Sequence, residues 1–271
     1  MSLKQFEVEF ESMRVHCYEG GSGFPVLLLH GSGAGTASAS NWARVLNELA
    51  SRYHVLAGDL IGFGLSARKA APPYFDLPLW TRQAQFLLDR LAAGKPVGII
   101  GHSLSGFLAL RLAAYNTNVI KVAATGCPSA HFRLTRALDV AWSMPSSQEQ
   151  LRELYAAVVA DTSGLSEEFY RQRLEVLRAP GYAQYFRAMF TGDKQSYLAQ
   201  LVLTPGELAA IQAQVLFIHG VRDRVVPFNE ATLPLLQSIR AADAVLLGDC
   251  GHGPALEQPR KFLHAIHDLF G

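Results

Sequence analysis

A serine stands at the apex of a turn of small residues. Residues 101–106 read Gly-His-Ser-Leu-Ser-Gly, after the apolar run 96–100 and before the helix-like stretch 107–114. A buried strand, a tight turn and a helix in this order are typical of a nucleophile elbow, which exposes a reactive serine hydroxyl. Small residues suit such a turn because strand and helix approach closely. The pattern predicts that Ser103 is a nucleophile, although Ser105 stands where glycine is usual; an ordinary Gly/Ser turn is the alternative.

A serine nucleophile needs a base, and the base needs an acid that orients it. Asp223 follows the apolar run 215–220, and His252 follows the run 244–247. Open α/β sheets carry their functional groups just past the carboxyl ends of the strands, so these side chains should meet at one edge. We therefore predict a Ser103–Asp223–His252 triad. Taken singly, the aspartate could be a loop cap and the histidine an ordinary loop residue, and Asp249 is the next candidate acid.

A glycine-rich loop at the front of the chain completes the chemistry. Residues 30–35 read His-Gly-Ser-Gly-Ala-Gly and follow the apolar run 25–29. Such a loop can turn the backbone N–H of Ser32 toward the serine, where it would join the N–H of Leu104 in an oxyanion hole. A phosphate cradle is the weaker alternative, because the spacing fits neither a P-loop nor a dinucleotide fingerprint.

These groups require a sheet whose strands end at a common edge. Apolar runs alternate with helix-like runs, which predicts an α/β fold with a mostly parallel, doubly wound sheet. The expected strands are 25–29, 55–59, 96–100, 119–125, 215–220 and 244–247. The expected flanking helices include 79–93 and 260–270, and residues 1–10 alternate in polarity like an edge strand.

Between residues 128 and 206 the alternation stops. Helix-like runs occur at 147–160, 166–177 and 194–203, and no strong strand pattern is found among them. A helical insertion between the serine and the acid is best interpreted as a lid, which excludes water and carries specificity. We expect a core formed by 1–127 and 207–271, with 128–206 as the lid.

Composition excludes several classes of function. The 271 residues are 49% hydrophobic with a net charge of +1 and no basic run, which argues against nucleic acid as a partner. No apolar signal or membrane-spanning run is present, and the three scattered cysteines fit a reducing compartment, so we expect a cytoplasmic protein. Metal-ligand spacings and cofactor fingerprints are absent. We expect a small-molecule carbonyl substrate, no metal and no cofactor; a homodimer is left open.

With these motifs in this order, the chain resembles the α/β-hydrolase superfamily over its whole length. Within it, the sequence is similar to the meta-cleavage-product hydrolases, which break a carbon–carbon bond in vinylogous diketones formed by aromatic ring cleavage. The stretches that carry this similarity are 30–42, 161–174 and 248–252.

The resemblance implies site residues position by position. Ser103, Asp223 and His252 would be the triad, with Ser32 and Leu104 as the oxyanion donors. Besides these, Asn41 and Arg173 would contact the substrate, the arginine facing the carboxylate or oxo end of a dienoate.

This chain departs from that family at three positions. The family has asparagine before the nucleophile, tryptophan after the catalytic histidine and proline in the glycine-rich loop; here these are His102, Gly253 and Ala34. His102 is typical of general esterases and lactonases and would also contact substrate. The expected function is therefore carbon–carbon bond hydrolysis in aromatic catabolism, with carboxylesterase or enol-lactonase as the alternative. A cofactor-free dioxygenase or haloperoxidase, and a non-catalytic binding protein on the same fold, are remote alternatives.

Overall fold

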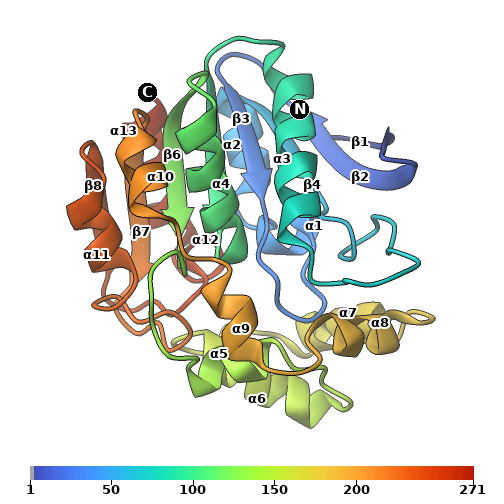
Figure 1. Ribbon diagram of the computed structural model, residues 1–271. Coiled ribbons are helices and arrows are strands. Elements are labelled where there is room, and N and C mark those ends of the chain that lie inside the picture. Colours follow the sequence, from blue (N-terminus) through green and yellow to red (C-terminus); the bar gives the residue numbers. More distant parts are fainter. Residues whose placement is uncertain (1–2) are drawn as a thin grey trace.

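The computed structural model describes residues 3–271 and is built around an eight-stranded sheet in the order β1-β2-β4-β3-β5-β6-β7-β8 (Figure 1). The strands are β1 (Lys4–Phe10), β2 (Met13–Gly20), β3 (Pro25–Leu29), β4 (His54–Gly58), β5 (Val97–His102), β6 (Val119–Thr125), β7 (Gln214–Gly220) and β8 (Ala242–Leu247). Only the pairs β1–β2 and β2–β4 are antiparallel. The predicted mostly parallel sheet is confirmed. β1 lies at its edge, and Met1 and Ser2 of the expected edge strand lie outside the described residues.

Helices cover both faces of the sheet, as a doubly wound fold requires (Figure 1). One face carries α3 (Leu77–Ala92), α4 (Leu104–Tyr115), α10 (Pro205–Ala210) and α11 (Thr232–Ser238); the other carries α2 (Leu46–Arg52) and α13 (Pro259–Phe270). Side chains alternate between two hydrophobic cores along β3: Leu27 and Leu29 belong to one, Val26 and Leu28 to the other. Burying each leucine stabilises the fold by roughly 1.5–3 kcal/mol.

The chain between β6 and α10 forms helices past the carboxyl ends of the strands (Figure 1). We call them the lid helices: α5 (Arg136–Ala141), α6 (Gln148–Val158), α7 (Glu167–Leu177), α8 (Tyr182–Met189) and α9 (Lys194–Ala199). Four of them begin at a side-chain cap, which accepts a backbone N–H of the first turn: Thr135, Ser147, Ser166 and Asp193. α10 packs instead against α4 of the core.

Two helices end earlier than the sequence predicts. The helix expected over 147–160 ends at Val158, because the next residues are extended and bind a loop of the core. The helix expected over 194–203 ends at Ala199, and α10 begins after it at Pro205. Short helices complete the fold at α1 (Ser38–Asn41) and α12 (Pro254–Glu257). Within residues 3–271, none of the helices combines the length and the hydrophobicity that crossing a bilayer needs.

The register of the parallel strands brings their carboxyl ends to one level. Leu29 of β3 pairs with Gly101 of β5, and His102 pairs with Thr125 of β6. Gly220 of β7 likewise pairs with Leu247 of β8. The loops that follow these strands therefore lie side by side, and all the predicted triad residues are on them.

Candidate active site

Ser103 occupies a strained turn between β5 and α4. Its backbone has φ 55° and ψ −124°, a region that costs a non-glycine residue roughly 1–3 kcal/mol. The turn closes tightly, since a Cβ atom at Gly101 would lie 2.2 Å from the carbonyl oxygen of Ser105. Leu104 is the first residue of α4, so its backbone N–H has no partner within the helix. This geometry is that of a nucleophile elbow beside one free donor.

Ser105 binds the elbow to the glycine-rich loop. Its hydroxyl donates to the carbonyl oxygen of His30 at 2.5 Å. His30 itself donates from Nδ1 to the Gly31 carbonyl at 2.7 Å and accepts the Leu60 N–H on Nε2 at 2.9 Å. Burial lowers the pKa of His30, which keeps the ring neutral. The polar residue that stands in the usual place of glycine thus fixes the loop that carries Ser32.

His252 and Asp223 are joined as a base and its orienting acid. His252 Nδ1 lies 2.8 Å from Asp223 Oδ2, and Asp223 Oδ1 accepts the N–H groups of Val225 and Val226 at 2.8 and 2.9 Å. Burial raises the pKa of Asp223, but the charge of His252 and these hydrogen bonds outweigh it, so the pKa is lowered overall. The carboxylate therefore stays ionised and holds the proton of His252 on Nδ1.

A second buried histidine, His219, packs beside Asp223. His219 Nε2 donates to the Val226 carbonyl at 3.0 Å, so Nδ1 accepts the hydroxyl proton of Thr232 at 2.9 Å. Burial lowers the pKa of His219, and its Nε2 stays 3.6 Å from Asp223 Oδ2. His219 is thus a neutral packing partner of the Asp223 loop. Asp249, the alternative acid, pairs with Arg222 at 2.8 Å on the surface, where its side chain is 77% exposed.

Gly126 makes room for the imidazole of His252. It follows β6 with φ +52°, and a Cβ atom there would lie 2.7 Å from both Cε1 and Nδ1 of His252. Nothing in the sequence distinguishes this glycine from the others, because the contact is with a residue near the other end of the chain.

Gly126→Ala is therefore expected to displace the imidazole and to lower kcat about tenfold or more, since small misplacements of a catalytic group are costly. The positive φ also predicts a loss of about 1 kcal/mol in the free energy of unfolding. Steady-state kinetics and urea denaturation measure the two effects. Gly181→Ala is the matched control, because Gly181 also has a positive φ but has nothing within 4 Å of its Cβ position. Equal kcat values for the two variants would contradict this role of Gly126.

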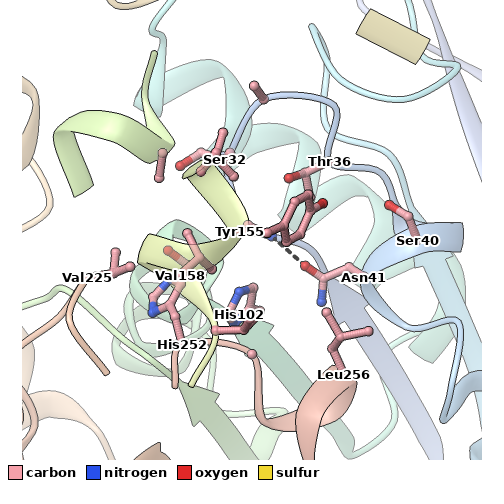
Figure 2. Close-up of a pocket in the computed structure, with 18 of the residues that line it drawn as sticks. Ser32, Thr36, Ser40, Asn41, His102, Tyr155, Val158, Val225, His252 and Leu256 are labelled. Carbon is pink, nitrogen blue, oxygen red and sulfur yellow. Dashed lines mark hydrogen bonds between the residues drawn. The ribbon is translucent and has the colours of Figure 1, made fainter. Parts of the chain in front are cut away.

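A cavity of about 100 Å³ joins Ser103 and His252 (Figure 2). Figure 2 shows Thr36, Ser40 and Asn41 on one side of it and Val225 on the other. The lining also includes Arg173, whose Nη1 donates to Ser40, and the side chains of Leu138, Ala141, Trp142, Tyr155, Val159 and Leu256. In the described part of the chain, no hydrogen bond joins Ser103 to His252; such contacts commonly tighten when substrate binds. No group of three His, Cys, Asp or Glu residues within 3–271 could hold a metal ion.

The expected oxyanion loop and the polar contacts lie on this cavity. Ser32 lines it, and its hydroxyl accepts the indole N–H of Trp142 from the lid helices at 2.9 Å. The backbone N–H of Gly31 donates to Asn41 Oδ1 at 3.3 Å (Figure 2). Because the amide oxygen is used in this way, the Nδ2 donors of Asn41 remain for a ligand.

Arg173 reaches the cavity from α7 and is buried, with 8% of its surface exposed. Nη1 donates to the Gly35 carbonyl at 2.5 Å and to the Ser40 hydroxyl at 2.7 Å. Both partners are neutral, and no ion pair among residues 3–271 includes this arginine. A buried cation without a carboxylate partner is a strong binding group for an anion.

His102 and Gly253 shape the site where this chain departs from the family pattern. The His102 ring lies 4.8 Å from that of His252, and burial together with the charge of His252 lowers its pKa to about 3. His102 is therefore neutral at physiological pH. Gly253 also lines the cavity without a side chain, and a Cβ atom there would make an ordinary contact of 3.5 Å with Leu256.

At the end of α6, the chain is hydrogen-bonded to the loops that carry His252 and Asp223. The His252 N–H donates to the Val158 carbonyl at 2.8 Å, and Glu257 Oε2 accepts the N–H groups of Gly251 and Ala160 at 2.8 and 2.7 Å. From the acid loop, Arg224 Nη2 donates to the carbonyls of residues 156 and 159 at 2.6 and 2.7 Å. The segment 156–160 is thus part of the framework that holds the triad.

Comparisons with known proteins agree with this geometry. Residues 26–265 match the model of the alpha/beta hydrolase family. The chain is 30% identical over 264 residues to a 2-hydroxymuconate semialdehyde hydrolase of Pseudomonas sp. (strain CF600), covering 97% of this chain and 92% of the relative. It is also 30% identical over 258 residues to a 2-hydroxy-6-oxo-2,4-heptadienoate hydrolase of Pseudomonas putida, covering 95% and 92%. Among solved structures, a meta-cleavage product hydrolase from Pseudomonas fluorescens IP01 superposes with a TM-score of 0.91 at 27% identity, covering 98% and 97%.

Proposed function

Because the chain belongs to the alpha/beta hydrolase family, we propose that it hydrolyses a carbon–carbon bond of a meta-cleavage product, a 2-hydroxy-6-oxo-dienoate. The observation that carries this proposal is the cavity beside Ser103. Nitrogen donors of Asn41 and Arg173 lie near Ser40, suited to the anionic dienoate end, and the apolar Val225 lies across the cavity from them, suited to the acyl end. The relatives named above, which are hydrolases of such compounds, support the same substrate class.

In the proposed mechanism, His252 Nε2 takes the proton of Ser103 as Oγ attacks the 6-oxo carbon. The N–H groups of Ser32 and Leu104 hold the oxyanion, and Asp223 stabilises the charged imidazole. This use of Nε2 follows from the hydrogen bond between His252 Nδ1 and Asp223.

The leaving group of this reaction is a carbanion, which is stable only if its charge can spread. The dienol must therefore first become a ketone, and Asn41 and Arg173 are placed to hold the negative charge that then develops at the far end. As the carbon–carbon bond breaks, its electron pair spreads to the 2-oxygen of the leaving group, which takes up a proton there; the proton that His252 gives up balances this uptake. Water, activated by the same imidazole, then hydrolyses the acyl-enzyme, giving a carboxylic acid and a 2-hydroxydienoate.

Residues 138–159 supply most of the apolar side chains that line the cavity. Trp142 stacks on Phe190 with ring centroids 4.9 Å apart and is held by its bond to Ser32. We propose that residues 128–206 act as a lid that excludes water and selects the acyl group, over a core of residues 1–127 and 207–271. The packing of α10 against α4 of the core supports a lid boundary near residue 206.

Ester or enol-lactone hydrolysis is the second candidate, favoured by His102 and by the absence of a side chain at Gly253. One panel separates the two: p-nitrophenyl esters, lactones and 2-hydroxy-6-oxo-dienoates assayed side by side with the same enzyme. A kcat/KM for a dienoate above that of every ester and lactone supports carbon–carbon hydrolysis. Turnover of esters or lactones with none of the dienoates would contradict it.

Arg173→Ala is expected to lower turnover of a 2-hydroxy-6-oxo-dienoate roughly 100-fold. Charge-assisted hydrogen bonds are each worth about 1.5–3 kcal/mol, and more where the partner would be left unpaired in a closed site. Arg173→Lys should recover only part of the rate, because an ammonium group cannot bind a carboxylate in bidentate fashion. Steady-state rates with a dienoate and with a small neutral ester make the comparison.

The ester has no anionic end, so its rate should change little; this also reports any damage from losing the bonds to Gly35 and Ser40. Arg171→Ala is the matched control, since Arg171 lies on the same helix with its side chain 65% exposed. Equal losses with dienoate and ester would assign Arg173 a purely structural role.

A further inference from the structure

A second cavity, of about 690 Å³, lies between α7 and the core; we call it the outer cavity. Its lining includes Ala39, Arg44 and Leu65 from the core, and Phe169 and Val176 from α7. Leu65 and Val176 are 57% and 38% exposed, so the outer cavity is open to solvent. The described residues that line the active-site cavity are instead all buried or half-buried.

The two cavities share a wall. Ser40, Arg173 and Leu256 line both of them. The guanidinium carbon of Arg173 lies 6.0 Å from the ring centroid of Tyr155, which lines the active-site cavity, and 5.5 Å from that of Phe169, which lines the outer cavity. One hydrogen bond within this wall, from Arg173 Nη1 to the Ser40 hydroxyl, is 2.7 Å long. The outer cavity therefore lies between this side of the active-site cavity and solvent.

The charged groups on the outer cavity favour an anion. Arg44 is exposed at its mouth, and Arg173 lies at its inner end. Asp59 is the acidic residue among the described lining residues; it is buried, and its carboxylate accepts the N–H groups of Ser38 and Leu65 at 2.7 and 2.9 Å. Cations that line a cleft raise the local concentration of an anionic substrate and its rate of association.

The position of Arg173 in the wall sets the direction in which a dienoate would enter. In the function proposed above, the anionic end binds at Arg173 and the acyl end lies toward Val225, which Figure 2 shows across the cavity from Ser40. A dienoate that passes the wall acyl end first therefore reaches its binding position without turning round. After the carbon–carbon bond breaks, the acyl group stays on Ser103 and the 2-hydroxydienoate lies next to the wall.

We propose, resting on that function, that the outer cavity is the passage by which an anionic dienoate reaches Ser103 and by which the 2-hydroxydienoate leaves. Arg44 attracts the anion to the mouth. Arg173 opens the wall when it exchanges its hydrogen bond with Ser40 for the substrate carboxylate. The 2-hydroxydienoate leaves first, because it lies between the acyl-enzyme and the passage, and its departure makes room for the attacking water.

A removable plug in the outer cavity tests the passage. Gly164 lines this cavity and has nothing within 4 Å of its Cβ position, so Gly164→Cys places a thiol in open space. The native cysteines are buried, so benzyl methanethiosulfonate should label the new thiol alone. Labelling should lower kcat/KM for a dienoate about tenfold, because a blocked path slows association. Dithiothreitol should remove the label and restore the rate.

Gly248→Cys is the matched control for the plug. Gly248 also has nothing within 4 Å of its Cβ position, but it follows β8 and is not among the described lining residues of either cavity. Its labelling should leave kcat/KM unchanged. A thermal melt of each labelled protein reports whether the label disturbs the fold.

Arg44→Glu tests the charge at the mouth independently. It should lower kcat/KM for a dienoate about tenfold at low ionic strength, and much less in about 0.5 M salt, because salt screens exposed charges. The rate with p-nitrophenyl acetate, which is uncharged, should change little. Arg52→Glu is the matched control, since it makes the same change of net charge at an exposed side chain that is not among the described lining residues of the outer cavity.

A labelled Gly164→Cys enzyme that keeps its full kcat/KM with a dienoate would overturn this proposal alone. The same holds if Arg44→Glu and Arg52→Glu have equal effects on the dienoate rate. An unmodified enzyme that cleaves esters and no dienoate would instead overturn the proposed function.

Discussion

Ser103→Ala is expected to lower kcat by about 10³-fold or more while the protein stays folded. The variant retains the proposed oxyanion donors and the cavity, which by themselves should support only a small residual rate. The substitution should not change the backbone strain of the turn, because serine and alanine both carry a Cβ atom at φ 55°. Steady-state kinetics with a dienoate and an ester, and a thermal melt, measure activity and folding separately.

The proposed triad should act as a unit, so a double variant is an internal control. His252→Ala should be about as severe as Ser103→Ala, and the two together should be little worse than either alone. Multiplication of the two losses would mean that the residues act in separate steps. Substantial turnover by Ser103→Ala would show that the nucleophile is another residue.

Asp223→Asn is expected to lower kcat by about 10³–10⁴-fold through the tautomer of His252. Oδ1 of Asp223 accepts the N–H groups of Val225 and Val226, so an asparagine would keep its oxygen there and turn its NH₂ toward His252. That NH₂ donates to Nδ1, and the imidazole proton is then forced onto Nε2. An Nε2–H cannot accept the proton of Ser103.

Asp249→Asn is the matched control, because Asp249 is exposed and paired with Arg222. The kcat of Asp249→Asn should equal that of the wild type. A severe loss in this variant, with none in Asp223→Asn, would show that Asp249 is the orienting acid. ¹⁵N spectra of His252 in the two variants report the tautomer directly.

The sequence is most informative where function depends on local pattern. Ser103, Asp223 and His252 each follow an apolar run, and the parallel sheet brings those run ends together. The alternation of strands and helices also follows from local sequence pattern, which explains why the fold class is predictable. The helix end at Val158 is less predictable, because the residues after it bind Glu257, far away along the chain.

Residues that hold the triad in place carry no such signal. Gly126 contacts the ring of His252, and Glu257 binds backbone N–H groups on either side of that histidine, yet both look ordinary in the sequence. Arg224, on the loop of Asp223, donates to the carbonyls of Ala156 and Val159. Each role is created by a contact between segments far apart in the chain, so periodicity and motif spacing cannot indicate it.

The bonds between segment 156–160 and the catalytic loops limit how new specificities can be engineered. A lid exchanged as a cassette would bring a foreign segment against Glu257 and Arg224, and would shift the base together with the pocket wall. A functional chimera must therefore keep these two residues and the end of α6 as one block.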